Sequence, residues 1–252
     1  MDNLQKFDHW VRSAPNLIAS EAPFSDFSSF DTKAISRDAK YQGNSRLGFL
    51  YQHLCSEVFK RDANYEIKLE EVQLSENGRT LGAIDLIVDN LTCHQLEHWE
   101  VAIKFYLLKD GIWYGPNAHD QLDKKLDRML NHQLNMSSSE AFQHAYPSLA
   151  VTSQHLLMQG RLYTNPFSNE QIPDQCLGYP LNPSQINGNW CYYHQAVKIG
   201  QSLFPLSKPQ WAIGTDDFSQ PIEPSSERFI HAQTEDGQFW FVVPDSWPNN
   251  KS

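Results

Sequence analysis

The sequence has no long hydrophobic run and few cysteines. No apolar stretch reaches the roughly 20 residues needed to cross a bilayer, and the opening MDNLQKFDHW has neither a basic start nor a continuous apolar segment. We therefore expect a cytoplasmic protein without a membrane-spanning segment. The 4 cysteines are scattered and form no CxxC pair, which argues against a structural zinc site and favours reduced thiols.

Basic residues are also scarce. Thirty acidic side chains against 20 basic ones give a formal net charge of -10, which disfavours a broad electrostatic surface for nucleic acid but is compatible with a local basic groove. The chain has no Gly-rich phosphate loop, no GxSxG elbow and no cysteine with an evident partner base. Any chemistry must therefore come from other groups.

The hydrophobic content is sufficient for a substantial core. Of the 252 residues, 40% are hydrophobic. We expect three segments: a helical N-terminal extension over residues 1–44, a core over 45–160, and a Trp-rich C-terminal extension over 161–252 that packs on the core. The tryptophans of the last segment are Trp190, Trp211, Trp240 and Trp247.

Hydrophobic periodicity predicts an α/β (α+β) fold. Helical spacing of apolar residues indicates an amphipathic helix over residues 46–61. Alternating apolar and polar side chains then predict strands over residues 65–74, 80–89 and 98–106. A helix with its N-cap at Asn117 is expected next, followed by a strand within residues 146–158. Two more strands, RFIHAQT and QFWFVVP, are expected to form a hairpin near the end.

Three charged residues lie inside these apolar strands. Asp85 interrupts the run from Leu81 to Val88, where an uncompensated carboxylate is costly to bury. In HWEVAIKFY, alternation places Glu100 and Lys104 on one face of the strand. Because the second and third strands are expected to be antiparallel neighbours, Asp85 and Glu100 should lie close together.

The order helix, three antiparallel strands, helix, strand, with an acid on the second strand and an acid plus a lysine on the third, resembles the PD-(D/E)XK nuclease superfamily. Five blocks also resemble the family known as the domain of unknown function 1853 (DUF1853). They are HWVRSAPNLIAS, GRTLGAIDLIVD, HWEVAIKFYL, WYGPNAHDQLDKKLDRMLNHQL and FVVPDSWP. The resemblance covers nearly the whole chain.

This resemblance implies a restriction-endonuclease-like core with a divalent metal site. Asp85 and Glu100 would hold Mg²⁺ or Mn²⁺, and Lys104 would position the attacking water and neutralise charge on a phosphate. Glu57 and Gln133 resemble auxiliary residues beside such sites. A solvated helix face and a buried, hydrogen-bonded glutamine are the respective alternative explanations.

The pattern departs from the superfamily at Ala102. The second acid usually stands two residues before the lysine, whereas Glu100 stands four before it. Four residues of strand separate Cα atoms by roughly 13 Å, against about 6.6 Å for two. Two registers remain open: Asp85 opposite Glu100, which leaves Lys104 remote, or Asp85 opposite Ala102, which leaves both charged residues within diagonal reach.

Two functions are compatible with these residues. The first is a metal-dependent phosphodiester hydrolase, a nuclease acting on DNA or RNA through Asp85, Glu100 and Lys104. The second is a catalytically inactive scaffold in which these charges only neutralise one another. Such a scaffold would bind a protein or a nucleic acid, with exposed aromatic side chains of the Trp-rich C-terminal part as the contact surface.

Overall fold

The computed structural model describes residues 2–36, 38–76 and 78–248. The chain forms two units. Unit 1 comprises Met1–Trp10, Lys104–Lys125 and Gly160–Ser252, and unit 2 comprises Val11–Ile103 and Leu126–Gln159. Each unit draws on separate stretches of chain, whereas the three segments predicted from the sequence are contiguous. The strands β3 (Gln95–Lys109) and β5 (Val151–Thr164) contribute residues to both units.

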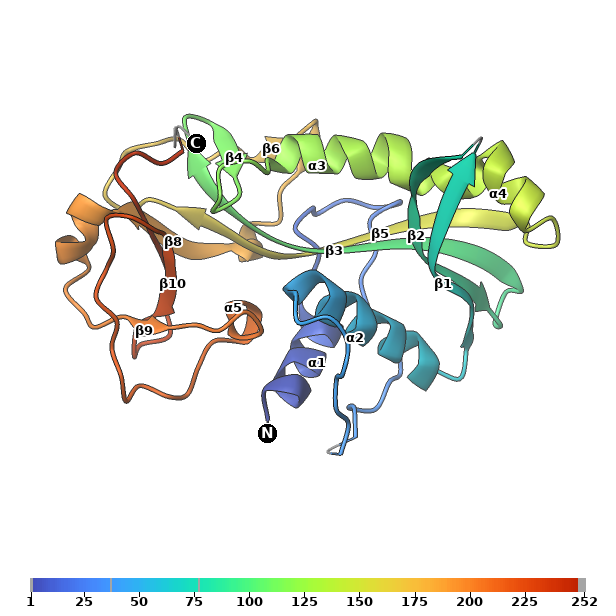
Figure 1. Ribbon diagram of the computed structural model, residues 1–252, viewed down its shortest axis with the longest axis horizontal. Coiled ribbons are helices and arrows are strands. Elements are labelled where there is room, and N and C mark those ends of the chain that lie inside the picture. The colour runs from blue at the N-terminus through green and yellow to red at the C-terminus, as the bar shows by residue number, and fades with distance from the viewer. Residues whose placement is uncertain (1, 37, 77, 249–252) are drawn as a thin grey trace. The chain divides into compact units, whose positions relative to one another are not determined.

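Unit 2 contains the helix, three strands, helical segment and strand that the periodicity predicts (Figure 1). Its strands are hydrogen-bonded in the order β1-β2-β3-β5, and β2 is antiparallel to both β1 and β3. The mixed α/β class is thereby confirmed, while the restriction-endonuclease-like core stays a prediction. Besides the first parts of β3 and β5, the elements are α2 (Leu47–Arg61), β1 (Tyr65–Glu76), β2 (Arg79–Asn90), η1 (Met129–Gln133), η2 (Leu134–Ser138) and α4 (Glu140–Ala145).

Two neighbouring residues of β3 show which helices cover each face of the sheet in unit 2. Trp99 packs against Phe59 of α2, with ring centroids 5.2 Å apart, while His98 contacts Ser137 of η2. Because adjacent strand residues point to opposite faces, α2 covers one face and η2 the other (Figure 1). The face under η2 is closed by a hydrophobic cluster of Leu74, Ile84, Ile87, Met136 and Phe142.

The helix expected from Asn117 begins later and changes geometry twice. α3 runs over Leu122–Arg128, and the chain continues as the π-helix η1 and the 3₁₀-helix η2. Asn117 Oδ1 instead accepts the backbone N–H of His119, at 3.2 Å, in a local turn. The predicted N-cap is therefore wrong, because an asparagine can satisfy a nearby N–H in a turn as well as at a helix end.

In unit 1 the second parts of β3 and β5 continue into a mixed sheet. The order is β3-β5-β8-β11-β10-β9, with β4 paired to β3, and β8 is parallel to both β5 and β11. β10 and β11 form the antiparallel hairpin predicted near the end of the chain. The strands are β4 (Ile112–Tyr114), β8 (Ile186–Tyr192), β9 (Phe204–Pro205), β10 (Ile230–Gln233) and β11 (Phe239–Val243).

Short elements complete the chain. They are α1 (Asn3–Ser13), β6 (Gln175–Cys176) paired with β7 (Tyr179–Pro180), η3 (Pro183–Gln185), η4 (Tyr193–Ile199) and α5 (Gln210–Ile213). Across the described residues, no helix has both the length and the apolar composition needed to span a membrane.

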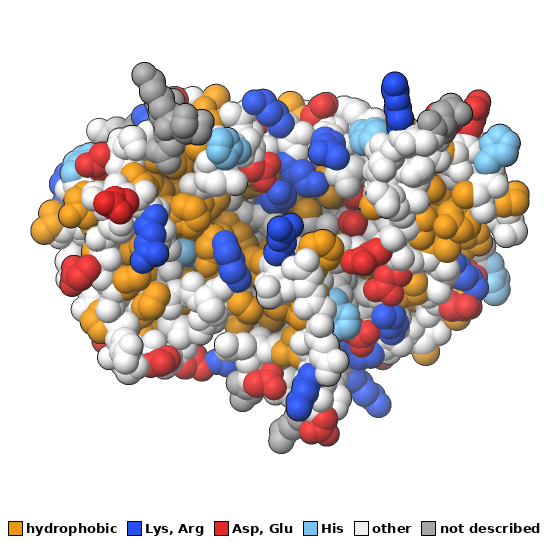
Figure 2. Space-filling model, in the orientation of Figure 1, with side chains coloured by type: hydrophobic (Ala, Val, Ile, Leu, Met, Phe, Trp, Pro, Cys, Tyr) orange, Lys and Arg blue, Asp and Glu red, His pale blue; other side chains and the backbone are white. Residues whose placement is uncertain are grey.

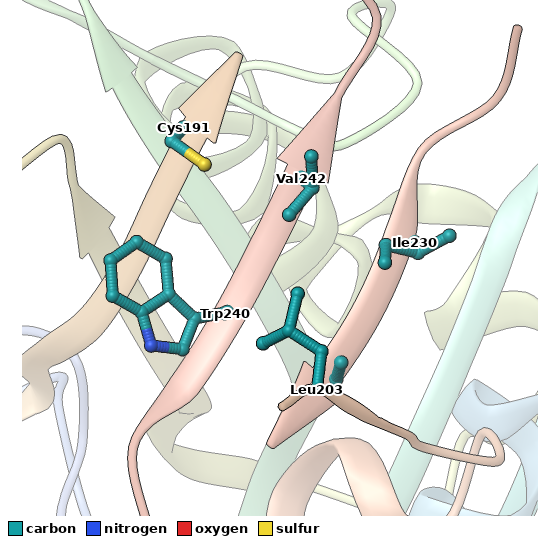
Figure 3. Packing of buried hydrophobic residues seen from close by; sticks show 6 residues of the cluster. Cys191, Leu203, Ile230, Trp240 and Val242 are labelled. Atoms are coloured by element: carbon teal, nitrogen blue, oxygen red, sulfur yellow. The ribbon is translucent and has the colours of Figure 1, made fainter. Parts of the chain in front are cut away.

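The C-terminal tryptophans lie inside unit 1. Trp240 belongs to a core cluster with Cys191, Leu203, Ile230, Ala232 and Val242 (Figure 3). All four are buried, with exposed fractions between 1% and 8%: Trp190, Trp211, Trp240 and Trp247. These rings therefore stabilise the unit by packing, and they do not provide the exposed aromatic surface expected for a binding module.

Candidate metal and catalytic site

Asp85 and Glu100 lie at the point where the backbone pairing of β2 with β3 ends. Beyond it, the two strands are joined by hydrogen bonds from main-chain N–H groups to the carboxylates of these two residues. The paired residues run from Asn90↔Gln95 to Leu86↔Trp99, a register that places Asp85 opposite Glu100. At this position Asp85 Oδ2 accepts the N–H of Val101 at 2.9 Å, and Glu100 Oε1 accepts the N–H of Asp85 at 3.3 Å. Each carboxylate thus binds the main chain of the neighbouring strand.

A local distortion of β2 accompanies this arrangement. Ile84 and Ile87 are three residues apart and would point to opposite faces of a regular strand, yet both belong to the cluster under η2. On β1, Glu71 lies between the residues paired with Leu86 and Ile84 and has a φ of 52°. A left-handed residue in a strand bends it locally and can redirect a side chain. Asp85 therefore lies at an irregular point of the sheet.

Glu100 is completely buried, and its carboxylate has polar partners on both oxygens. Besides the N–H of Asp85, the polar partners are His98 Nε2, 3.0 Å from Oε1, and Gln133 Nε2, which donates to Oε2 at 2.7 Å. Burying a charge is tolerable only when such bonds replace its water. Each carboxylate oxygen has about two acceptor positions, and two of these partners already lie at Oε1. Glu100 could therefore act only as a monodentate ligand, through Oε2.

His98 connects Glu100 to η2. Its Nδ1 lies 2.9 Å from Ser137 Oγ and 3.1 Å from the carbonyl oxygen of Leu134. Burial lowers the pKa of His98 to about 4, and the contact with the Leu134 carbonyl and the charge of Asp85 oppose this only in part. The imidazole is therefore neutral at pH 7. The sequence gives His98 no metal-ligand spacing and no other role, although strand alternation already places it on the same face as Glu100.

Gln133 is brought to Glu100 by the π-helix η1. Leu126 of α3 and Met129, the first residue of η1, are both buried. A π-helical turn has more residues per turn than an α-helix and therefore shifts the direction of the side chains that follow it. The contact with Glu100 agrees with the position expected for an auxiliary residue, and the auxiliary role itself stays a prediction.

Glu57 lies elsewhere on α2. On α2, the pKa values of Tyr51 and Cys55 are raised chiefly by burial, and the nearby charge of Asp85 raises them further. Glu57 follows Cys55 by two residues, a rotation of about 200° around the helix axis. Its carboxylate lies 3.3 Å from Lys60 Nζ. A surface ion pair thus accounts for Glu57, and its auxiliary role stays a prediction.

Lys104 belongs to unit 1. Its Nζ lies 2.6 Å from Asp120 Oδ2, and the hydroxyl of Tyr106 donates to the same oxygen at 3.2 Å. The side chains of Lys104 and Asp120 are 26% and 36% exposed. Asp120 thus neutralises Lys104 within the unit, and the role of Lys104 in catalysis stays a prediction.

The residues present fit one kind of metal ion. Among the described residues, no group of three or more His, Cys, Asp and Glu side chains is arranged to hold a metal. Mg²⁺ usually takes one or two carboxylates and completes its octahedral shell with water and substrate oxygens. Asp85 and Glu100 together meet that requirement.

Comparisons with known proteins give one match. A family model described as "Domain of unknown function (DUF1853)" matches residues 7–234. The searches of curated proteins and of solved structures found no match.

Proposed function

Because the chain belongs to the DUF1853 family, whose description names no activity, we propose a function from the chemistry of the site. The proposal is a divalent-metal-dependent phosphodiester hydrolase that acts on nucleic acid. One observation carries it: Asp85 and Glu100 lie opposite each other on two adjacent strands where backbone pairing stops, and the carboxylate of each binds the opposite main chain. Such cross-bonding fixes both carboxylates on rigid elements.

The roles of the residues follow from their contacts. Asp85 and Glu100 would hold Mg²⁺ or Mn²⁺, which when bound polarises a phosphate oxygen and lowers the pKa of a water. Gln133 fixes the Oε2 side of Glu100 through a bond of 2.7 Å. The resemblance to the PD-(D/E)XK superfamily assigns Lys104 to neutralise charge on the phosphate. In the register with Asp85 opposite Glu100, Lys104 is the remote member of the three, so its role rests on the resemblance alone.

The negative net charge of the protein favours a binding mode in which the metal ion attracts the phosphate of the substrate. The net charge is -10, and the face drawn in Figure 2 carries both acidic and basic side chains. A protein with a large negative net charge gains little from counterion release on nucleic acid unless it has a local basic surface. A metal ion held by two carboxylates would supply the positive charge that a phosphate requires.

Metal binding is the first test. Titration calorimetry with Mn²⁺ should detect binding by the wild type and at least a tenfold lower affinity for Asp85→Asn, because the amide keeps the bond to Val101 but loses the charge. Asp89→Asn is the matched control, since Asp89 lies on the same strand and pairs with Lys68 at 3.3 Å. Absence of binding to the wild type at millimolar Mn²⁺ and Mg²⁺ contradicts the proposal.

Hydrolysis is the second test. Single-stranded and double-stranded DNA and RNA oligonucleotides should be cleaved with Mn²⁺ or Mg²⁺ and left intact with a chelator. Glu100→Gln and Asp85→Asn should each lower the rate by about 10² to 10³, a loss typical of removing one charge-stabilising group. Equal cleavage by wild type and both variants would indicate a contaminating nuclease and contradict this assignment.

A catalytically inactive scaffold is the second candidate. The observation that favours it is the extent to which Glu100 is already hydrogen-bonded, since three polar partners also suit a purely structural buried carboxylate. That candidate predicts binding of an oligonucleotide or a protein that a chelator does not change, without cleavage. A gel-shift assay with and without Mn²⁺ separates it from the hydrolase.

A further inference from the structure

We infer that His98 is a positioning residue for Glu100: its ring carries the proton on Nε2, donates it to the carboxylate, and is held in place by Ser137. The metal-binding consequence of this inference rests on the proposed function, whereas the position of the proton does not. His98 is not placed as a metal ligand itself, because both of its ring nitrogens already contact protein atoms.

The contacts surround the ring on both sides. His98 and Glu100 are two residues apart on β3 and therefore share a face. Nε2 lies 3.0 Å from Glu100 Oε1, and Nδ1 lies 2.9 Å from Ser137 Oγ. His98 and Glu100 are completely buried, and Ser137 is 5% exposed. The ring is thus fixed between β3 and η2.

The partners decide which nitrogen carries the proton. Glu100 Oε1 is an acceptor, and a hydrogen bond to a charged group contributes roughly 1.5–3 kcal/mol, against about 1 kcal/mol for a neutral pair. On the other side, the carbonyl of Leu134 already accepts Gln154 Nε2 at 2.7 Å, and the hydroxyl of Ser137 can donate to Nδ1. A proton on Nε2 satisfies Glu100 and Ser137 together.

The consequence for Glu100 is a defined orientation. With Oε1 bound by His98 and by the N–H of Asp85, the other oxygen is directed toward Gln133. Only Oε2 could then bind a metal ion. Histidine bonds of this kind orient carboxylates around metal sites, and their loss typically costs 10- to 100-fold in affinity.

A metal-free experiment tests the proton position. Nitrogen-15 NMR of the histidine rings in the wild-type protein at pH 7.5 should show the His98 Nε2 protonated and its Nδ1 as a hydrogen-bond acceptor. His98→Gln identifies the signal by its loss. A protonated Nδ1 with a bare Nε2 would overturn the inference, because the ring would then donate to Leu134 rather than to Glu100.

Two variants test the positioning role. Glutamine places its amide near the site of Nε2 and asparagine near that of Nδ1. Calorimetry with Mn²⁺ should therefore find His98→Gln within about threefold of the wild type and His98→Asn weaker by about 10- to 100-fold. Equal losses in both variants, with equal falls in melting temperature, would mean that His98 only fills space.

The outcomes remain separable from those of the proposed function. If the wild type binds no Mn²⁺, the hydrolase proposal fails, and the NMR result alone then decides whether His98 orients Glu100. If the wild type binds Mn²⁺ and His98→Asn binds it equally well, the hydrolase proposal stands and the positioning role is overturned. Ser137→Ala, which removes only the hydroxyl, should shift the His98 Nδ1 resonance without removing the Nε2 proton.

Discussion

At the scale of single residues, Gly160 marks a place where two strands of unit 1 approach closely. Its φ is 151°, a conformation that L-residues rarely adopt, and a Cβ there would overlap the carbonyl oxygen of Lys104. Gly160→Ala should therefore lower the free energy of unfolding by about 2–5 kcal/mol, the combined cost of overpacking and backbone strain. Urea denaturation measures this loss.

The control for this prediction is Gly48→Ala in α2. A Cβ at Gly48 meets no atom within 4 Å, and alanine is the better helix former by about 1 kcal/mol. We expect this variant to be as stable as the wild type or slightly more so. An unchanged denaturation midpoint for Gly160→Ala would show that β3 and β5 can separate at that point.

Lys104 allows stability and catalysis to be separated. Its ion pair with Asp120 is partly exposed, so Lys104→Met should cost at most about 1 kcal/mol of stability. If the residue acts on the phosphate, the same change should lower hydrolysis by about 10² or more at an unchanged melting temperature. Lys109→Met, on the same strand and paired with Asp110 at 2.8 Å, should retain the wild-type rate.

The sequence reveals some residue-scale features and not others. A carboxylate inside an apolar strand, such as Asp85 or Glu100, needs a partner, and this requirement can be read from the pattern itself. The identity of the partner cannot, because Ser137 is 39 residues from His98 and Gln133 is 33 from Glu100. Only the fold brings these groups together.

At the scale of elements, α4 depends on its N-terminal cap. Ser139 Oγ accepts the N–H of Phe142 at 3.2 Å, and Phe142 is buried in the cluster under η2. Ser139→Ala should therefore lower the free energy of unfolding by about 1 kcal/mol, whereas Ser139→Asp, which retains an acceptor, should cost less. Denaturation curves test this order, with exposed Ser138→Ala as the control. Equal stability of Ser139→Ala and the wild type would contradict the capping role.

Hydrophobic periodicity predicts a helix or strand well when one regular side-chain spacing, helical or alternating, runs through the whole element. The helix over residues 46–61 and the three antiparallel strands recur as α2, β1, β2 and β3 with small changes at their ends. The π-helix η1 has no such signal, because its extra residue is stabilised by tertiary contacts such as that of Gln133 with Glu100. The parallel pairing of β8 with β5 and β11 is equally hidden, since distant segments form it.

At the scale of the whole molecule, buried neutral histidines couple folding to pH. His98 in unit 2 and His231 in unit 1 both have pKa values lowered chiefly by burial, to about 4 for His98. An unfolded histidine takes up its proton near pH 6.5. Between these values the unfolded chain binds more protons than the folded one, so stability is fully present above about pH 6.5 and decreases as the pH falls toward 4.

The size of this effect is measurable. The shift of His98 alone corresponds to a loss on the order of 3 kcal/mol across that pH range. Urea denaturation at pH 7.5, 5.5 and 4.5 should show this decline, and His98→Gln, which cannot titrate, should make it shallower. His144→Gln, at an exposed position of α4, should leave the decline unchanged. A His98→Gln protein that loses stability with acid as steeply as the wild type would show that His98 is already protonated in the folded state, where it would form an ion pair with Glu100.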